Sequence, residues 1–393
     1  MNQAKKRIVV GITLAEPGGA TSFVFGFSKW LQQQGHEVIV LAGDGGWLFD
    51  RCREAGISAY RIRGLGRAIR PVRDWFAYRE IKQRLLDLKP DVVHVNSAKM
   101  GVLGSLAARR AKVPRVVYRI GGWSFLEPIL WPLPWFYRTV EWLTAGLKDV
   151  IVCVHSEDER IARTYGIRPR EKMVTIPNGI DLFQFDRSLQ PRDYGRTLLQ
   201  LDPRAFVFGT VAHFYPAKDI PRYLEACAMV AHQRPRALFV IIGNGPERRW
   251  IRLKRFNLGL EREVILAGNH ENAASLMRAF DAFVLPSQKE GMSRALLEAM
   301  SAGLPCIATD VGASRWMLGD DAGWIVPRRS PKEMAAAMLF VMDHAEEAKQ
   351  RGANARRAVD NRFPLNANYI QNETVLFGDG LTSAAPTPSS PAP

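Results

Sequence analysis

Short apolar runs alternate with helix-forming stretches along most of this chain. In the first half, buried strands are predicted at residues 7–11, 37–42, 91–95, 115–118 and 150–154. In the second half, the pattern repeats at residues 206–212, 237–242, 264–267, 282–285 and 306–308. Strands that alternate with helices in this way predict an α/β fold with doubly wound parallel sheets. Because 393 residues exceed one ordinary hydrophobic core, we expect two such domains in tandem.

The alternation loosens between residues 178 and 205, where proline, glycine and aspartate are frequent. We therefore predict an N-terminal domain at residues 1–183 and a C-terminal domain at residues 184–375. Residues 376–393 are rich in proline, serine, threonine and alanine, and we expect a disordered tail. In open α/β sheets, ligands bind at the carboxyl ends of the strands, so the site is expected there.

The net charge of +15 is distributed unevenly. Residues 1–180 hold 28 basic and 16 acidic side chains, a balance of +12, whereas residues 181–393 hold 26 and 23, a balance of +3. Such a basic half suits nucleic acid, an anionic membrane surface or an anionic substrate. The four cysteines are scattered without a C-x-x-C pair, so neither disulfides nor a zinc site are expected. We expect neither a signal peptide, because the apolar run after Arg7 is short, nor a transmembrane helix, because no apolar window reaches membrane-spanning length.

The stretch 280–309 predicts one strand–loop–helix–strand unit with two carboxylates. Ser293 is suited to cap a helix over residues 294–301, which Gly303 and Pro305 terminate. Unpaired N–H groups at such a helix start attract anions. Glu290 in the loop and Glu298 in the helix can accept hydrogen bonds from hydroxyls. The combination suits a ligand with phosphates and sugar hydroxyls, although two glutamates at this spacing are also common on plain surface helices.

The residues around these carboxylates resemble a known signature. Pro-Ser precedes the loop, Glu-Gly opens it and Gly-Leu-Pro closes the helix, which resembles the Glu-x7-Glu motif of retaining glycosyltransferases of family 4. The resemblance implies the GT-B fold, in which two Rossmann-like domains face each other across a cleft. It also implies that Glu290 holds sugar hydroxyls and Glu298 holds ribose hydroxyls, while the amides of Gly291, Met292 and Ser293 stabilise the donor diphosphate.

The segment 212–219 resembles the family's Gly-Arg-Leu-x-x-x-Lys-Gly sequence, whose arginine and lysine bind the diphosphate. Lys218 matches the lysine, and His213 stands where arginine is usual. Histidine lacks the permanent charge and the forked donors of arginine. Gly243 and Asn244 belong to a turn that resembles the family's Gly-x-Gly-Pro turn near the donor. The resemblance makes Lys218 and Glu290 the expected catalytic pair.

Three features of the first half complete the expected site. Gly18 and Gly19 follow the first strand, where the resemblance implies a loop that faces the donor. Lys99 lies in a strand-to-helix loop of the kind that meets an acceptor phosphate, or it is a plain surface lysine. Gly121 and Gly122 occupy a segment in which the family usually has histidine, so their backbone would approach the sugar instead.

Residues 123–137 are aromatic and proline-rich, and arginines surround them in the sequence. Tryptophan and tyrosine favour the membrane interface, and arginine favours anionic lipid. We therefore predict a peripheral protein that docks through its basic N-terminal domain on the inner face of the cytoplasmic membrane. A buried core flap is the alternative interpretation.

These features predict a retaining glycosyltransferase that moves a sugar from a UDP- or GDP-sugar to a lipid-linked or envelope saccharide, as in lipopolysaccharide, capsule or exopolysaccharide synthesis. A catalytically degenerate nucleotide-sugar-binding partner protein and a nucleotide-sugar epimerase of the same fold are the alternatives. We expect no metal, because no Asp-x-Asp motif is placed in the site, and no cofactor besides the substrate. No nucleic-acid-binding module is recognised in the sequence.

Overall fold

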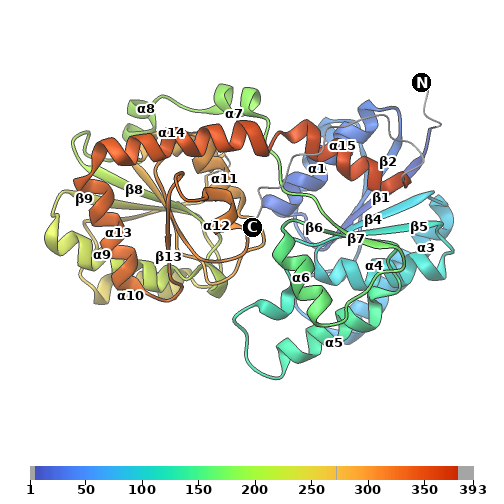
Figure 1. Cartoon of the computed structure of the whole chain (residues 1–393). Helices are drawn as coiled ribbons and strands as arrows, with labels where there is room; N and C mark the ends of the chain where they lie inside the picture. The colour runs from blue at the N-terminus through green and yellow to red at the C-terminus, as the bar shows by residue number, and fades with distance from the viewer. Residues whose placement is uncertain (1–4, 271, 379–393) are drawn as a thin grey trace. The chain divides into compact units, whose positions relative to one another are not determined.

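The computed structural model describes residues 5–270 and 272–378. The chain divides into two compact units, each of which is described by itself (Figure 1). The first unit contains the residues up to Pro177 together with those from Asn366 onward, and the second unit runs from Asn178 to Leu365.

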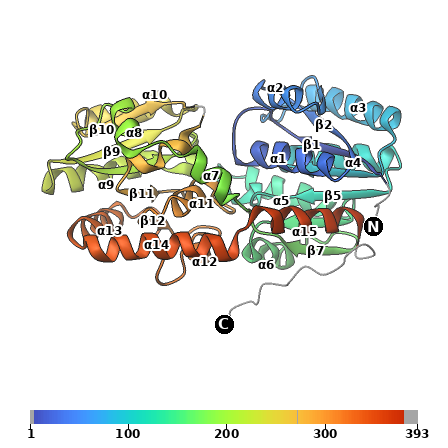
Figure 2. The same cartoon turned by 90° about the horizontal axis from the view of Figure 1, so that it is seen from above.

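A seven-stranded parallel sheet forms the centre of the first unit, in the order β3-β2-β1-β4-β5-β6-β7. Its strands are β1 (Arg7–Ile12), β2 (Glu37–Ala42), β3 (Ser58–Arg61), β4 (Val92–Asn96), β5 (Arg115–Arg119), β6 (Val150–Cys153) and β7 (Lys172–Thr175). The inner strands are rich in valine and isoleucine, as expected for parallel strands that are buried on both faces. Helices cover the sheet on both sides (Figure 2).

The two faces of this sheet carry different side chains. Val93 and Val95 of β4 pack with helices α3 (Pro71–Leu88) and α4 (Ala98–Arg110). His94 points to the opposite face and contacts the rings of Phe23 and Phe27. The helices are α1 (Gly19–Gln33), α2 (Trp47–Glu54), α3 (Pro71–Leu88), α4 (Ala98–Arg110), α5 (Leu133–Ala145), α6 (Ser156–Thr164) and α15 (Leu365–Phe377), with a 3-10 turn η1 (Ser124–Leu126).

The second unit is built on a six-stranded parallel sheet in the order β10-β9-β8-β11-β12-β13. Its strands are β8 (Phe206–Val211), β9 (Ala237–Ile242), β10 (Val264–Gly268), β11 (Ala282–Leu285), β12 (Cys306–Thr309) and β13 (Trp324–Val326). Buried phenylalanines such as Phe208 and Phe239 stack within its core. The point where the strand order reverses lies between β8 and β11, at which ligands of open α/β sheets bind.

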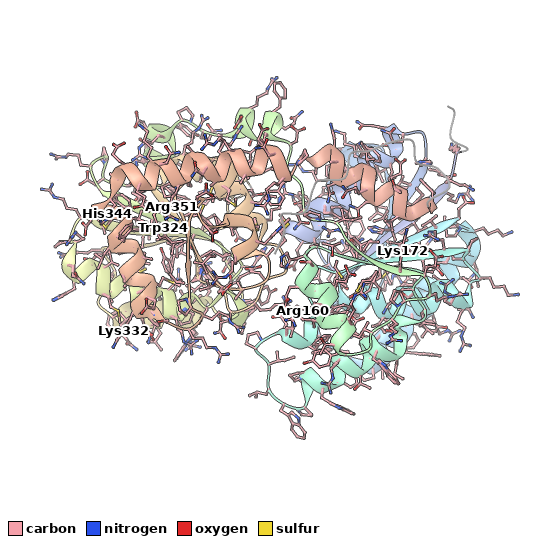
Figure 3. The ribbon with its side chains drawn as sticks, in the orientation of Figure 1. Arg160, Lys172, Trp324, Lys332, His344 and Arg351 are labelled. Atoms are coloured by element: carbon pink, nitrogen blue, oxygen red, sulfur yellow. The ribbon has the colours of Figure 1, made fainter. Side chains whose placement is uncertain are left out.

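Helices enclose this second sheet as well. They are α7 (Leu182–Ser188), α8 (Arg192–Leu198), α9 (Ile220–Gln233), α10 (Arg248–Asn257), α11 (Arg294–Ser301), α12 (Ser314–Leu318), α13 (Pro331–Asp343) and α14 (Ala345–Arg362), with 3-10 turns η2 (Pro216–Lys218) and η3 (Ala273–Ala279). At the edge strand β13, the Arg351 guanidinium lies 4.8 Å from the Trp324 ring centre and so fixes α14 on the sheet (Figure 3).

The ten strands predicted from the sequence are all present, with ends that differ by at most one residue. The structure adds β3, β7 and β13, which are short and partly exposed. The stretch expected to be a loose linker contains the short helices α7 and α8. Asp181 caps α7, since its side chain accepts a hydrogen bond from the amide of Gln184.

The course of the chain near its end differs from the predicted domain limits. The sequence places residues up to 375 in the second domain, but α15 packs on the first unit. Tyr369 contacts Phe23 and Phe27, and the side-chain amide of Asn368 donates to the carbonyl of Pro177. The predicted tail 376–393 begins inside α15, which ends at Phe377, and residues 379–393 lie outside the described part of the chain.

Candidate functional site

The loop between β11 and α11 has the local structure that its sequence predicts. Ser293 is the N-cap of α11, and its hydroxyl accepts a hydrogen bond from the amide of Leu296 at 3.3 Å. Gly303 follows the helix with a φ of 73°, a left-handed conformation that glycine adopts without strain. The predicted cap and stop of this helix are therefore confirmed.

Glu290 lies in this loop, and two side chains bind one of its carboxylate oxygens. Lys218 Nζ and Ser287 Oγ each donate to Glu290 Oε1 at 2.6 Å. Ser287 is buried, the Glu290 side chain is nearly so, and Lys218 is about one quarter exposed. Among the described residues, no donor is bonded to Glu290 Oε2, so that oxygen can accept a hydrogen bond from a ligand hydroxyl.

Two further hydrogen bonds fix the loop that contains Glu290, one to the loop that contains Lys218 and one to strand β12. The amide of Gln288 donates to the carbonyl of Ala217 at 2.7 Å, next to Lys218. Thr309, at the end of β12, donates to the carbonyl of Ser287 at 2.6 Å. The position of the Glu290 carboxylate is thus set by loops that follow neighbouring strands of one sheet. The sequence predicts the pairing of Lys218 with Glu290 only through its resemblance to family 4.

Asn178 belongs to this site although the sequence predicts no role for it, because it lies at the start of the stretch 178–205, where the strand–helix alternation loosens. Its side-chain amide donates to the carbonyl of Met292 at 3.0 Å, and its backbone amide lies 3.1 Å from the Met292 sulfur. On the other side of the loop, the amide of Ala313 donates to the carbonyl of Gly291 at 2.8 Å. A Cβ at Gly312 would lie 2.2 Å from that same carbonyl oxygen, so only glycine fits there.

Glu298, the second predicted carboxylate, lies on α11. Its Oε1 accepts a hydrogen bond from Arg294 Nε at 2.8 Å, one helical turn earlier. The Glu298 side chain is mostly buried, whereas Arg294 is more exposed. The arginine neutralises the carboxylate and leaves its second oxygen without a bonded donor among the described residues.

The loops that follow β8 and β9 are bonded to each other. The amide of Phe214 donates to the carbonyl of Asn244 at 2.8 Å, and the Asn244 side chain accepts from the amide of Gly245 at 2.9 Å. Gly243 has a φ of 144°, and a Cβ there would lie 1.9 Å from the carbonyl oxygen of Ala212. The structure therefore places His213, Gly243 and Asn244 at the carboxyl ends of adjacent strands, in the same unit as Lys218 and Glu290.

Gly18 and Gly19 lie at the start of α1 in the first unit, after β1. Gly18 is extended and its carbonyl accepts the first helical hydrogen bond, from the amide of Ser22 at 2.8 Å. Gly122 has a φ of 104°, which favours glycine, while a Cβ at Gly121 would meet nothing within 4 Å. The approach of these backbone positions to a sugar stays a prediction.

Lys99 has partners within its own unit. Its ammonium lies 2.8 Å from Asp74 Oδ1 and also donates to the carbonyl of Ala68. The side chain is largely buried, so the interpretation as a plain solvated lysine does not describe it. Contact with an acceptor phosphate would require Lys99 to exchange the Asp74 carboxylate for that phosphate, and the role stays a prediction.

Arg119, at the end of β5, is a second residue without a signal in the sequence analysis. It is buried, and its guanidinium lies 3.8 Å from the centre of the Phe23 ring. Burial lowers the pKa of Arg119 to about 10. Burial and then the nearby Arg119 charge lower the pKa of His94 to about 3, so that this histidine is neutral at physiological pH.

The aromatic stretch 123–137 divides into two parts. Trp123 and Phe125 belong to the core, and the Trp123 indole donates to the carbonyl of Asp158 at 2.7 Å. Leu130 and Trp131 are each 85% exposed, and Trp135 and Phe136 are also exposed. The interpretation as a core flap therefore holds for the start of the stretch, and an exposed apolar surface begins only after it.

Neither a metal cluster nor a membrane span was found in the part of the chain that the structure describes. Within it, no group of three or more His, Cys, Asp or Glu side chains is arranged to hold a metal ion. No helix among the same residues is both long and apolar enough to cross a membrane.

Family models of glycosyltransferases match both halves of the chain. The family model described as Glycosyltransferase Family 4 matches residues 17–183, and the one described as Glycosyl transferases group 1 matches residues 197–358. A UDP-Gal:alpha-D-GlcNAc-diphosphoundecaprenol alpha-1,3-galactosyltransferase of Escherichia coli is 28% identical over 327 residues, which cover 80% of this chain and 84% of that protein. A phosphatidyl-myo-inositol mannosyltransferase of Mycolicibacterium smegmatis is 27% identical over 342 residues, covering 83% and 82%.

Solved structures show the same architecture. Anabaena HepE in complex with UDP and glucose superposes with a TM-score of 0.81 at 19% identity, covering 95% of this chain and 99% of that chain. WaaG, a glycosyltransferase involved in lipopolysaccharide biosynthesis, superposes with a TM-score of 0.75 at 17% identity, covering 94% and 100%. At these identities the likeness establishes the fold.

Proposed function

Because this chain belongs to glycosyltransferase family 4 and has the GT-B fold, we propose that it transfers a sugar from a UDP-sugar to a lipid-linked saccharide, with retention of the anomeric configuration. The choice of a UDP donor and of a polyprenyl diphosphate-linked acceptor is supported by the substrates that the name of the Escherichia coli relative prints. A role in building an envelope polysaccharide is supported by two further relatives, whose names print lipopolysaccharide core biosynthesis and colanic acid biosynthesis.

The Glu290 carboxylate, held by Lys218 and Ser287 in front of α11, is the observation that carries this proposal. Its free oxygen would accept a hydroxyl of the donor sugar. Departure of the nucleoside diphosphate builds negative charge on the β-phosphate, and fixed positive groups stabilise such charge most when they need not reorganise. Lys218 and the amides of Gly291, Met292 and Ser293 are the groups proposed for that role.

Glu298 would bind the ribose hydroxyls through its second carboxylate oxygen. His213 would donate one hydrogen bond to the diphosphate, and the loop at Gly243 and Asn244 would pass close to the nucleotide. Gly18, Gly19, Gly121 and Gly122 would let the backbone of the first unit approach the sugars. We propose that no divalent ion is essential, because lysine and backbone amides supply the positive charge, and that no cofactor besides the nucleotide-sugar is needed.

We further propose that the first unit docks on the inner face of the cytoplasmic membrane. The segment from Leu130 to Phe136 exposes leucine and aromatic side chains, and α3 exposes Trp75 and Phe76. Five arginines lie close by in the sequence, between Arg61 and Arg73. Exposed tryptophan beside arginine is typical of protein surfaces that bind anionic membranes.

A degenerate nucleotide-sugar-binding protein is the second candidate, and one observation favours it. Gly121 stands where the family usually has a histidine, and no side chain lies within 4 Å of a Cβ built at that position. Such a protein would bind the donor without turning it over.

Release of nucleoside diphosphate from UDP-, GDP- and ADP-sugars, with a membrane extract as acceptor, tests the proposal. We expect release from a UDP-sugar, insensitive to EDTA, in the wild type and in the exposed control Glu261→Ala. The variant Glu290→Ala should lose the activity. Donor binding in a thermal-shift assay without turnover would favour the degenerate binder, and the absence of both would refute the donor site.

A further inference from the structure

Helix α10 of the second unit presents apolar side chains to solvent. Trp250, Leu253 and Phe256 are 56%, 48% and 66% exposed. They recur every three residues and so lie on one side of the helix, while Ile251 on the opposite side is fully buried in the core. A surface helix normally places polar residues on its outer face, so this helix has two apolar faces where packing requires only one. Figure 2 shows α10 on the surface beside β10.

The same helix is strongly basic. Its ten residues contain five arginines or lysines and no acidic residue. Lys254 lies 2.7 Å from Glu225, and Arg255 donates to the carbonyl of Val264 at 3.1 Å, so these two side chains serve the unit's own structure. Arg248, Arg249 and Arg252 are exposed, and none is in an ion pair with a described residue.

Helix α14 of the same unit shows what a solvated helix of this protein looks like. It is eighteen residues long, carries both acidic and basic side chains, and exposes no large apolar side chain. Basic charge alone therefore does not distinguish α10. The combination of three unpaired arginines with exposed tryptophan, leucine and phenylalanine does.

We propose that α10 is a lipid-binding helix that lies on an anionic bilayer surface. Tryptophan and phenylalanine enter the boundary between headgroups and acyl chains, and arginines alongside them pair with lipid phosphates. A nucleic acid would use the arginines but would leave Leu253 without a partner. This inference rests on the proposed function only because a lipid-linked acceptor would bring the protein to a membrane. It gives the second unit a membrane contact of its own, through α10.

Vesicle co-sedimentation with the full-length protein tests this assignment. Vesicles of phosphatidylcholine alone are compared with vesicles that contain 30% phosphatidylglycerol, a proportion of roughly one anionic lipid in three that gives a clear surface potential. We expect Arg249→Glu/Arg252→Glu to weaken binding to the anionic vesicles by about 30-fold or more, since each basic residue near the surface contributes about fivefold. Trp250→Ser/Phe256→Ser should weaken it by about tenfold.

The matched control is Lys349→Glu/Arg357→Glu on α14, which changes the net charge equally at two exposed positions. Equal losses in the two charge-reversal variants would overturn the proposal, because only the net charge would then matter. Unchanged vesicle binding in both α10 variants would overturn it as well. Loss of binding to single-stranded RNA, with vesicle binding intact, would instead assign the helix to nucleic acid.

A probe at the helix itself makes the test direct. Phe256→Cys, labelled with the fluorophore NBD, is selective because the four native cysteines are buried. We expect a blue shift of NBD emission on anionic vesicles, and no shift would contradict insertion. Turnover of a detergent-dispersed acceptor should be unchanged in the α10 variants. If the proposed transferase activity is wrong, the wild type will show no turnover. The vesicle-binding assay would still test the role of α10, because it does not depend on turnover.

Discussion

Lys218 Nζ lies 2.6 Å from Glu290 Oε1, although 72 residues separate the two in the chain. Their loops follow β8 and β11, the two neighbouring strands at which the order of the second sheet reverses. The pair therefore combines a cation and a carboxylate at the point where such sheets bind ligands. One oxygen of the carboxylate is bonded to Lys218 and Ser287, and none of the residues that the structure describes donates to the other.

Replacing the Glu290 carboxylate by an amide should lower kcat strongly. Glu290→Gln keeps the size of the side chain but removes its charge, so that Lys218 loses its ion-pair partner and the sugar hydroxyl loses an acceptor. Misplacement of a reacting group by such a change typically costs about 100-fold. Steady-state release of nucleoside diphosphate measures the effect, and Glu261→Gln, at an exposed position, should be indistinguishable from wild type.

Removing the Lys218 ammonium should affect the transition state more than donor binding. We expect Lys218→Met to lower kcat by about 100- to 1,000-fold, the usual cost of losing one group that stabilises developing charge. Lys218→Arg should recover part of this activity, because the positive charge returns with a different shape. Equal activity in the Met and Arg variants would show that the charge has no catalytic role.

The side chain of Asn178 should matter for the donor, although it lies outside the motif. Asn178→Ala removes the hydrogen bond to the Met292 carbonyl, which costs about 1 kcal/mol of stability and frees the loop. We expect the KM for the donor to rise about tenfold, the equivalent of about 1.4 kcal/mol. Asn178→Asp should be no better, because a carboxylate cannot donate to a carbonyl. Asn361→Ala, at an exposed position, is the control, and equal KM values in all four proteins would refute a role of the Asn178–Met292 hydrogen bond in donor binding.

The buried His94 should make the first unit sensitive to acid. Its folded-state pKa is lowered from 6.5 to about 3, so the unfolded chain binds a proton that the folded chain does not. The neutral ring therefore contributes stability that is complete above pH 6.5 and is lost as the pH falls toward 3. Between pH 7 and pH 5 we expect a loss of about 2 kcal/mol, which hydrogen exchange of the β4 amides measures. In His94→Gln this dependence on pH should disappear.

The exposed aromatic residues after η1 should contribute to membrane binding independently of α10. Trp131→Ser/Trp135→Ser removes two exposed indoles that make no described contact with the core. We expect weaker binding to anionic vesicles, by about tenfold, because interfacial tryptophan is lost while every charge remains. Trp123→Phe is unsuitable as a control because that indole is buried, so Tyr194→Ser, an exposed position in the second unit, serves instead. Unaltered vesicle binding would refute docking through this segment.

The sequence predicted most strands of both sheets, because a buried parallel strand is a short run rich in valine and isoleucine that can be recognised from neighbouring residues alone. It also predicted the cap at Ser293, since the capping bond spans only three residues. It did not predict the bond between Asn178 and Met292, which joins positions 114 residues apart. Nor did it separate the buried Trp123 from the exposed Trp131, because Trp123 is buried by core residues from distant parts of the chain, which a local pattern does not reveal.

The chain crosses between the units twice, near Pro177 and again near Leu365, so the second unit is an insertion within the first. Residues 178–365 form one continuous piece of the chain, whereas the first unit is completed only when α15 has been synthesised. On the ribosome, the first unit must therefore wait for the second to emerge before its aromatic contacts at Tyr369 can form. A premature stop codon after Leu365 would therefore destabilise the first unit, although most of that unit is encoded before residue 178.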